Sequence, residues 1–93
     1  MKNTTTKMQR FLRSFASKRR IDILLLIEKE NNLSIREISK KLRTGEQNIS
    51  LHTFKLLNAG LIAKMQLKNK VVHTLTSRGK FILAFIKNID RRL

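Results

Sequence analysis

Residues 34–75 read SIREISKKLRTGEQNISLHTFKLLNAGLIAKMQLKNKVVHTL, and this stretch decides the fold. Ser34 and Glu37 form the pattern of a capping box, in which the serine accepts a hydrogen bond from a first-turn amide and the glutamate reaches back to the serine amide. The pattern predicts a short helix over residues 35–42. The similar run at 44–47 predicts a second capping box and a second helix. Two such helices joined by a tight turn have the spacing of a helix-turn-helix.

A short basic hairpin is expected directly after the second helix. Gly60 is suited to end that helix, and the β-rich runs 61–67 and 71–75 are joined by a short turn in which Asn69 can adopt a positive φ. Helices followed by such a hairpin, or wing, indicate a mainly α winged helix-turn-helix fold with a small β-hairpin.

The 93 residues are expected to form a single winged-helix domain. Its predicted parts are N-terminal helices over 7–31, the helix-turn-helix over 35–59, the wing over 61–75 and a C-terminal helix over 77–92. A third capping-box pattern at 6–9 precedes the first helix. Whether 7–31 forms one kinked helix or two is left open, because only serines separate the two halves.

The chain is strongly basic, with 21 Lys and Arg against 6 Asp and Glu and a net charge of +15. Residues 47–89 contain no acidic side chain. Such a charge favours a polyanionic partner, and double-stranded DNA is the partner expected for this fold. The alternative interpretation is a basic surface that only serves solubility.

Several missing features narrow the range of functions. The chain contains no cysteine, which excludes disulfides and thiolate metal sites. No apolar run approaches the roughly 20 residues that span a bilayer, so a cytoplasmic protein with no membrane partner is expected. No Gly-rich phosphate loop and no nucleophile with a base are evident, so no enzyme activity, cofactor or metal site is predicted. The frequent Lys, Ile and Asn are compatible with an AT-rich genome, such as that of a heat-adapted archaeon or its virus.

The second helix of the helix-turn-helix is expected to read DNA bases. If Ile49, Thr53 and Leu56 face the core at about 100° per residue, an amide-rich face points outward. Amide side chains can pair with adenine and lysine with guanine or phosphate, while an exposed leucine can meet a thymine methyl group. The predicted DNA-binding residues are Ser34, Gly45, Gln47, Asn48, Ser50, Leu51, His52 and Lys55 in the helix-turn-helix, and Lys64, Lys68 and Lys70 in the wing.

Some of these positions have competing interpretations. Phe54 also faces outward, and we expect it to pack against the wing or a neighbouring helix. His52 lies at the border of the two faces, where a groove contact and a half-buried, hydrogen-bonded position are both open. With His73 as the only other imidazole, a metal site is not expected. The wing lysines could instead be solvated, because lysines on exposed strands also discourage pairing with other sheets.

Five segments within residues 20–79 together carry a family resemblance. They are Arg20 to Leu26, Leu33 to Ile38, Ile49 to His52, Leu56 to Ile62 and Leu75 to Gly79. This pattern resembles that of ArsR- and MarR-type transcriptional regulators. The resemblance implies a recognition helix over 45–59 in the major groove, a wing over 61–75 on the DNA backbone or in the minor groove, and terminal helices that form a homodimer. A wing glycine, a late wing aromatic and the ArsR-type sensing cysteines are missing, so a metal response is not implied.

The aromatic side chains also predict a dimer. Four of the five phenylalanines lie in the two terminal helices, where they would leave exposed apolar stripes on a monomer. We expect these helices to pack about a two-fold axis, with the two recognition helices about 34 Å apart. The predicted interface residues are Met8, Phe11, Leu12, Phe15, Phe81, Ile82, Phe85, Ile86 and Ile89.

The predicted function is a sequence-specific, double-stranded DNA-binding transcription regulator that acts as a homodimer. A nonspecific architectural DNA-binding protein is the main alternative, and a winged helix that binds RNA or protein is a weaker one. Gln47, Asn48 and Asn58 favour the specific regulator, because a protein that only coats DNA needs no base-reading amides.

Overall fold

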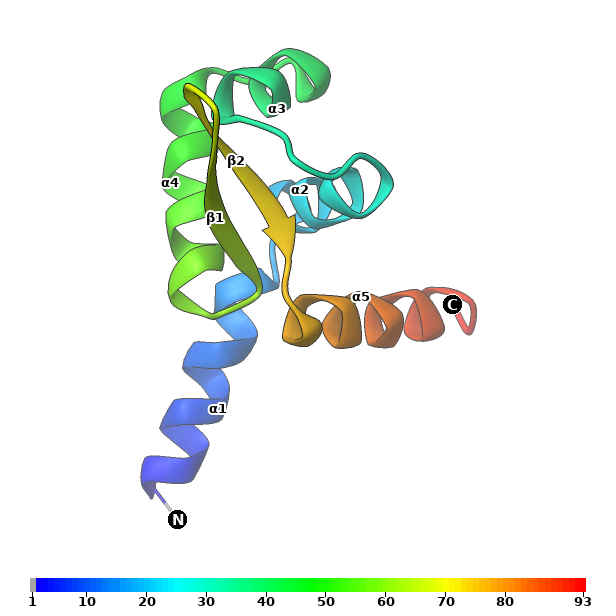
Figure 1. Ribbon diagram of the computed structural model, residues 1–93. Coiled ribbons are helices and arrows are strands. Elements are labelled where there is room, and N and C mark those ends of the chain that lie inside the picture. Colours follow the sequence, from blue (N-terminus) through cyan, green and yellow to red (C-terminus); the bar gives the residue numbers. More distant parts are fainter. Residues whose placement is uncertain (1) are drawn as a thin grey trace.

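The protein is described by a computed structural model, which covers residues 2–93 and is mainly helical. Figure 1 shows α4 and the hairpin side by side, α3 near the hairpin tip, α5 leading away from the base of the hairpin, and α1 projecting from that same end, away from the hairpin tip. This arrangement is a winged helix-turn-helix, which confirms the predicted fold class. The elements in chain order are α1 (Lys2–Phe15), α2 (Lys18–Lys29), α3 (Ile35–Leu42), α4 (Glu46–Asn58), β1 (Ile62–Leu67), β2 (Lys70–Leu75) and α5 (Ser77–Asp90).

The hydrophobic core is built around α2. Ile23, Leu24 and Ile27 on this helix are fully buried. Each of the other elements contributes one apolar side to the same cluster, since burying such side chains is the dominant favourable term in folding. The remaining buried core residues are Phe15, Leu33, Ile38, Ile49, Leu56, Leu61, Ile62, Val72, Ile82 and Leu83.

The N-terminal segment forms two helices. Ser17 has an extended backbone and its side chain accepts a hydrogen bond from the Arg20 amide at 3.2 Å, so it caps a new helix. This result settles the question that the sequence left open. The capping box predicted at 6–9 is wrong, because α1 already begins at Lys2 and Thr6 lies inside it.

The first capping box of the helix-turn-helix is confirmed. Ser34 accepts from the Glu37 amide at 3.2 Å, and the Glu37 carboxylate accepts from the Ser34 amide at 2.9 Å. The second predicted box is wrong, because α4 is capped by Gly45 without a side-chain bond. The Thr44 hydroxyl instead donates to the Leu42 carbonyl at 3.1 Å, at the end of the preceding helix.

The wing is a regular antiparallel hairpin. Its register runs from the pair Ile62 and Leu75 at the base to Leu67 and Lys70 at the tip. The positive φ of the turn, 58°, belongs to Lys68 and not to Asn69, so the predicted role of the asparagine is wrong.

The outer edge of β2 and the base of the wing are both anchored to the core. The His73 amide donates to the Leu33 carbonyl at 2.9 Å, and the buried His73 ring contacts the same oxygen through Nδ1 at 2.9 Å. At the start of α5, a Cβ on Gly79 would lie 2.1 Å from the Leu61 carbonyl oxygen. The wing is therefore held against the body at two points, which fixes its direction relative to α4.

Candidate nucleic-acid interface

The recognition helix α4 presents the face that its periodicity predicts. Ile49, Thr53 and Leu56 are at most 2% exposed and pack against the core. The side of α4 away from the core carries the predicted base-reading and phosphate-binding groups. Its exposed residues are Gln47, Asn48, Ser50, Leu51, Phe54, Lys55 and Asn58.

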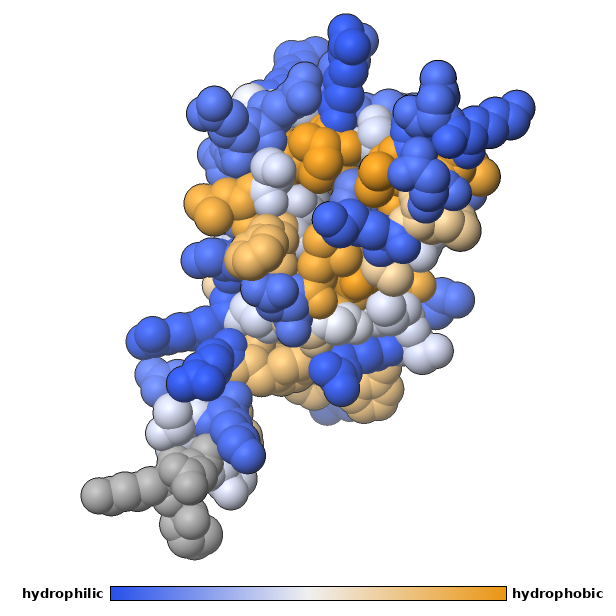
Figure 2. Space-filling view, turned by 60° about the vertical axis from the view of Figure 1, so that its left-hand side comes forward, coloured by the Kyte–Doolittle hydropathy of each residue, from blue (hydrophilic) through white to orange (hydrophobic). Residues whose placement is uncertain are grey.

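The centre of this face is apolar. Leu51 is 55% exposed and Phe54 is 59% exposed, so the prediction that Phe54 is packed away against the wing or a neighbouring helix is wrong. Phe54 instead lies at the border of a groove of about 420 Å³ between α4 and the wing, together with Ser50 and Lys64. Figure 2 shows apolar atoms gathered in the middle of one face and ringed by hydrophilic ones. Such a surface can combine apolar contacts with base edges and cationic contacts with the backbone.

Ser34 and Gly45 lie at the starts of α3 and α4. The Ser34 hydroxyl is used in the capping box, and the residue borders the same groove as Ser50. Gly45 has open space around the position of a Cβ. The amides of a helix start favour an anion, so both positions remain predicted phosphate contacts.

His52 does not stand free on the DNA side of α4. The Arg20 Nε donates to His52 Nδ1 at 3.1 Å, and the ring is half-buried. The half-buried position is therefore correct, and the predicted groove contact is not supported by this geometry. Burial lowers the pKa of His52 below its usual value, and the nearby charge of Arg20 lowers it further. The lowered pKa favours the neutral ring, whose Nδ1 can accept the hydrogen bond from Arg20.

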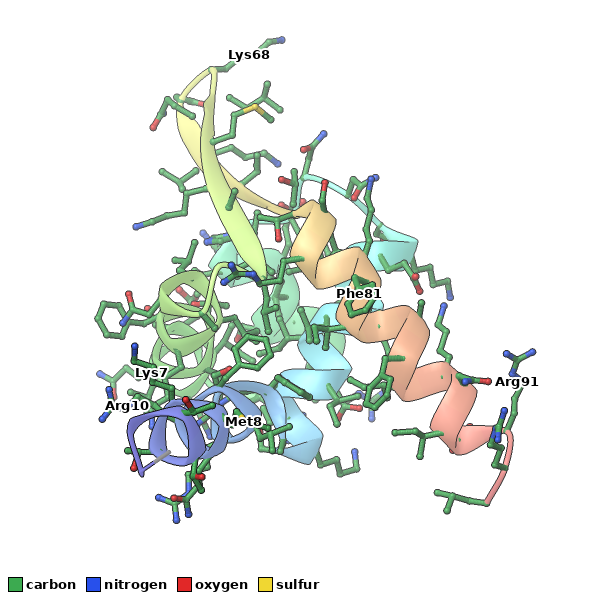
Figure 3. All side chains as sticks on the ribbon, turned by 90° about the horizontal axis from the view of Figure 1, so that it is seen from below. Lys7, Met8, Arg10, Lys68, Phe81 and Arg91 are labelled. Atoms are coloured by element: carbon green, nitrogen blue, oxygen red, sulfur yellow. The ribbon has the colours of Figure 1, made fainter. Side chains whose placement is uncertain are left out.

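The wing lysines differ in how free they are. Lys64 and Lys68 are exposed and form no ion pair with the described residues, and Lys68 stands at the hairpin tip (Figure 3). Lys70 pairs with Glu37 at 3.2 Å, with both side chains about half exposed. The hydrogen bond from the Ser34 amide, followed by the contact with Lys70, lowers the pKa of Glu37. Lys70 thus links the wing to α3, and Lys64 and Lys68 remain the wing lysines predicted to contact phosphate that have no ion-pair partner among the described residues.

The predicted dimer residues fall into three groups, which are buried, partly buried and exposed in the single chain. Phe15 and Ile82 are only 6% and 7% exposed and belong to the core of a single chain, so their assignment to the interface is wrong. Phe11 and Ile86 are partly buried against that core. The sequence could not separate the buried residues from the exposed ones, because they lie on the same amphipathic stripes. The remaining apolar side chains are well exposed: Met8 59%, Leu12 51%, Phe81 72%, Phe85 51% and Ile89 43%.

Sequence reasoning missed three arginines at this interface. Arg36 borders the groove between α4 and the wing. Arg20 and Arg78 lie at the other end of α4, where Arg78 Nη1 donates to the Ala59 carbonyl at 2.9 Å. Arg36 comes from α3, Arg20 from α2 and Arg78 from α5, so the helical periodicity of α4 carried no signal for them.

No cluster of three or more His, Cys, Asp or Glu side chains that could hold a metal ion occurs among residues 2–93. None of the helices in this range has the length and apolar character needed to span a bilayer.

Solved structures with the same fold include regulators from several bacteria. HlyU from Vibrio cholerae N16961 is 28% identical, with a TM-score of 0.75, and the match covers 98% of this chain and 96% of HlyU. The homodimeric winged helix-turn-helix DNA-binding domain of Mb0332 from Mycobacterium bovis has a TM-score of 0.83 at 14% identity, over 96% of this chain and 82% of that one. A MarR family protein from Bacillus stearothermophilus has a TM-score of 0.77 at 18% identity, over 97% of this chain and 65% of that one. The last two similarities concern the fold alone.

The sequence itself supplies the family. None of the curated protein sequences matches this chain. Residues 17–64, more than half of the 93 residues, match the sequence profile described as "Bacterial regulatory protein, arsR family". That region runs from the cap of α2 through the helix-turn-helix into the wing. The chain therefore belongs to the arsR family of bacterial regulatory proteins.

Proposed function

We propose that this protein is a homodimeric transcription regulator that recognises a specific sequence in double-stranded DNA. In this proposal α4 lies in the major groove and the wing contacts the backbone. The observation that carries it is the exposed face of α4, where amide side chains flank an apolar centre beside unpaired wing lysines. HlyU, which is similar over nearly its whole length, is described as a transcriptional regulator in Vibrio vulnificus CMCP6.

The amides on α4 favour sequence reading over general coating. Gln47 and Asn48 are exposed in the first turn of α4, where a recognition helix meets base edges. Neither side chain makes a hydrogen bond with the described residues, so both are available to adenine. A coating protein gains its affinity from phosphates alone and has no use for such groups.

The homodimer is supported by the exposed apolar side chains of α1 and α5. Met8 and Leu12 lie one helical turn apart on α1, and Phe81, Phe85 and Ile89 are spaced by four residues along α5. Each set therefore forms a stripe along its helix. A second copy of the same surface would cover these stripes and place two recognition helices on successive major grooves.

Selection of bound fragments from random double-stranded DNA tests this proposal directly. The expected result is an enriched palindrome whose half-sites lie about one helical turn apart, as a two-fold dimer requires. Enrichment of a single unrepeated element would contradict the dimer. Binding without any enriched sequence would identify an architectural protein, and no binding at low salt would end the nucleic-acid interpretation.

Substitutions then separate the roles of α4 and the wing. Gln47→Ala is expected to relax the preference at one base pair, at a cost of about 1–3 kcal/mol if its contact is bidentate. Lys64→Gln with Lys68→Gln is expected to weaken binding to all sequences alike, because phosphate contacts carry no sequence information. The opposite pattern in competition assays with base-substituted operators would reverse the two assignments.

A further inference from the structure

A second basic surface lies outside the helix-turn-helix and the wing. α1, the C-terminal half of α4 and the start of α5 enclose an open cleft of about 470 Å³, with Phe11 among its lining residues. Six cationic side chains line it and no acidic one does. We call this the α1 cleft, and its cations are Lys7, Arg10, Arg13, Arg20, Lys55 and Arg78.

The charge of the α1 cleft is not neutralised within residues 2–93. The five ion pairs formed by these residues involve Asp22, Glu28, Glu30 and Glu37, and none reaches a cation of the cleft. Like charges gathered without counter-charges repel one another, and a bound anion would remove that repulsion.

Two of the six cations are held in fixed positions. Arg20 donates to the Arg13 and Ser14 carbonyls at 2.6 and 3.2 Å as well as to His52. Arg78 donates to the Ala59 carbonyl at the end of α4, where it also offsets the partial negative charge of the helix terminus. The cleft thus has a preorganised floor, while Lys7, Arg10 and Arg13 are exposed at its rim.

The rim cations lie on the same side of the molecule as α4. In Figure 3, Lys7 and Arg10 point to the side of α4, whereas Met8 points to the side of α5. Lys55 and Asn58 belong both to the exposed face of α4 and to the lining of the cleft. The cleft therefore continues the recognition face beyond the C-terminal end of α4.

We infer that the α1 cleft binds phosphate groups of the DNA backbone beyond the C-terminal end of α4, as a third DNA contact in addition to α4 and the wing. This inference rests on the proposed DNA-binding function. Backbone phosphates flank the major groove on both sides, so a helix inserted in the groove brings them near both of its ends. The wing then serves one end of α4 and the α1 cleft the other.

The lowered pKa of His52 is consistent with this positive environment. After burial, its causes are the charges of Arg20, Arg19 and Lys55, two of which line the cleft. A phosphate in the cleft would reduce this influence. His52 therefore provides a reporter inside the protein that does not depend on the measurement of affinity.

The test compares three variants on the selected operator. The cleft variant carries Lys7→Gln, Arg10→Gln and Arg13→Gln. The control variant removes the same charge at exposed positions elsewhere, with Lys29→Gln, Lys80→Gln and Arg92→Gln. The wing variant carries Lys64→Gln and Lys68→Gln. Affinity is measured over a salt series, phosphate ethylation interference maps the contacts, and thermal melting checks that each variant folds.

Each lost phosphate contact is expected to lower the slope of log K against log salt by about 0.9, or by about 5 if all three rim cations of both protomers are in contact. Ethylation of certain phosphates should also no longer reduce DNA binding by the cleft variant, although it still reduces binding by the wing variant. On addition of operator DNA, the pKa of His52 measured by NMR should rise in the wild type and rise less in the cleft variant.

The inference is overturned if the cleft and control variants have the same slope, or if the cleft and wing variants lose the same phosphates. It is also overturned if inorganic phosphate alone raises the His52 pKa while DNA does not, since the site would then serve a small anion. In each of these cases the wing variant still loses affinity, so the proposed function stands. Failure of every variant and of the wild type to bind DNA would refute the proposed function itself.

Discussion

Replacing Phe81 by glutamate tests the proposed dimer at its most exposed apolar side chain. Phe81 is 72% exposed in the single chain, so the substitution leaves the monomer core intact. Full burial of a large apolar side chain contributes about 1.5–3 kcal/mol, so covering most of Phe81 contributes about 1–2 kcal/mol, or about 2–4 kcal/mol for both copies in a dimer. The dimer dissociation constant is therefore expected to rise at least about 30-fold, since 1.4 kcal/mol is a factor of ten. Placing a carboxylate in an apolar interface adds to this loss.

Sedimentation equilibrium on the wild type and on Phe81→Glu measures the effect. Lys80→Gln is the control, because it lowers the net charge by the same amount at an exposed neighbour that lies about 100° around the helix. We expect the control to remain dimeric and Phe81→Glu to become monomeric with an unchanged melting curve. A monomeric wild type at micromolar concentration, or a Phe81→Glu dimer as tight as the wild type, would refute this use of the α1 and α5 stripes.

Three further predictions concern the fold, the specificity and the pH dependence. Gly79→Ala should lower the free energy of unfolding by about 1–3 kcal/mol, because its Cβ would meet the Leu61 carbonyl at 2.1 Å, whereas Gly45→Ala, with open space, should change it far less in urea titrations. If Leu51 contacts thymine methyl groups, replacing thymidine by deoxyuridine in the operator should weaken binding of the wild type and leave the affinity of Leu51→Ala unchanged. An equal loss of affinity in both proteins would contradict this contact. Because the folded-state pKa of His52 lies below 6.5, the fold loses stability as the pH falls through 6.5, and His52→Asn should flatten the change in the urea midpoint between pH 7.5 and 5.5.

The sequence predicted those parts of the fold that depend on local order. Helical periodicity correctly placed Ile49, Thr53 and Leu56 on the buried side of α4, since spacing along one helix is enough to define its faces. Ser34 was correctly identified as a cap because its partner Glu37 lies within the same turn. In both cases the residues that determine the structure lie within about one or two helical turns of each other.

The wrong predictions have two physical causes. Some depend on which of several nearby groups a side chain bonds to, and others depend on contacts between segments that are distant in the sequence. The Thr44 hydroxyl donates to the Leu42 carbonyl at the end of α3, while Gly45, which has no side chain to accept an amide hydrogen bond, occupies the N-cap of α4. Phe15 and Phe81 both look like interface residues in the sequence, and only the docking of α1 and α5 buries the first and exposes the second. The α1 cleft likewise exists only because α1 packs beside the far end of α4.

The distribution of paired and unpaired charge connects these conclusions. Of the five ion pairs among the described residues, two lie within α2, and the other three join α5 to α2, α3 to the C-cap of α2, and β2 to α3. The cations of the α1 cleft and of the wing tip have no such partner there, so their mutual repulsion raises the free energy of the free protein. DNA relieves this repulsion only in the complex. Each unpaired cation therefore lowers the free energy of the proposed DNA complex more than that of the free protein, as expected for a binding surface.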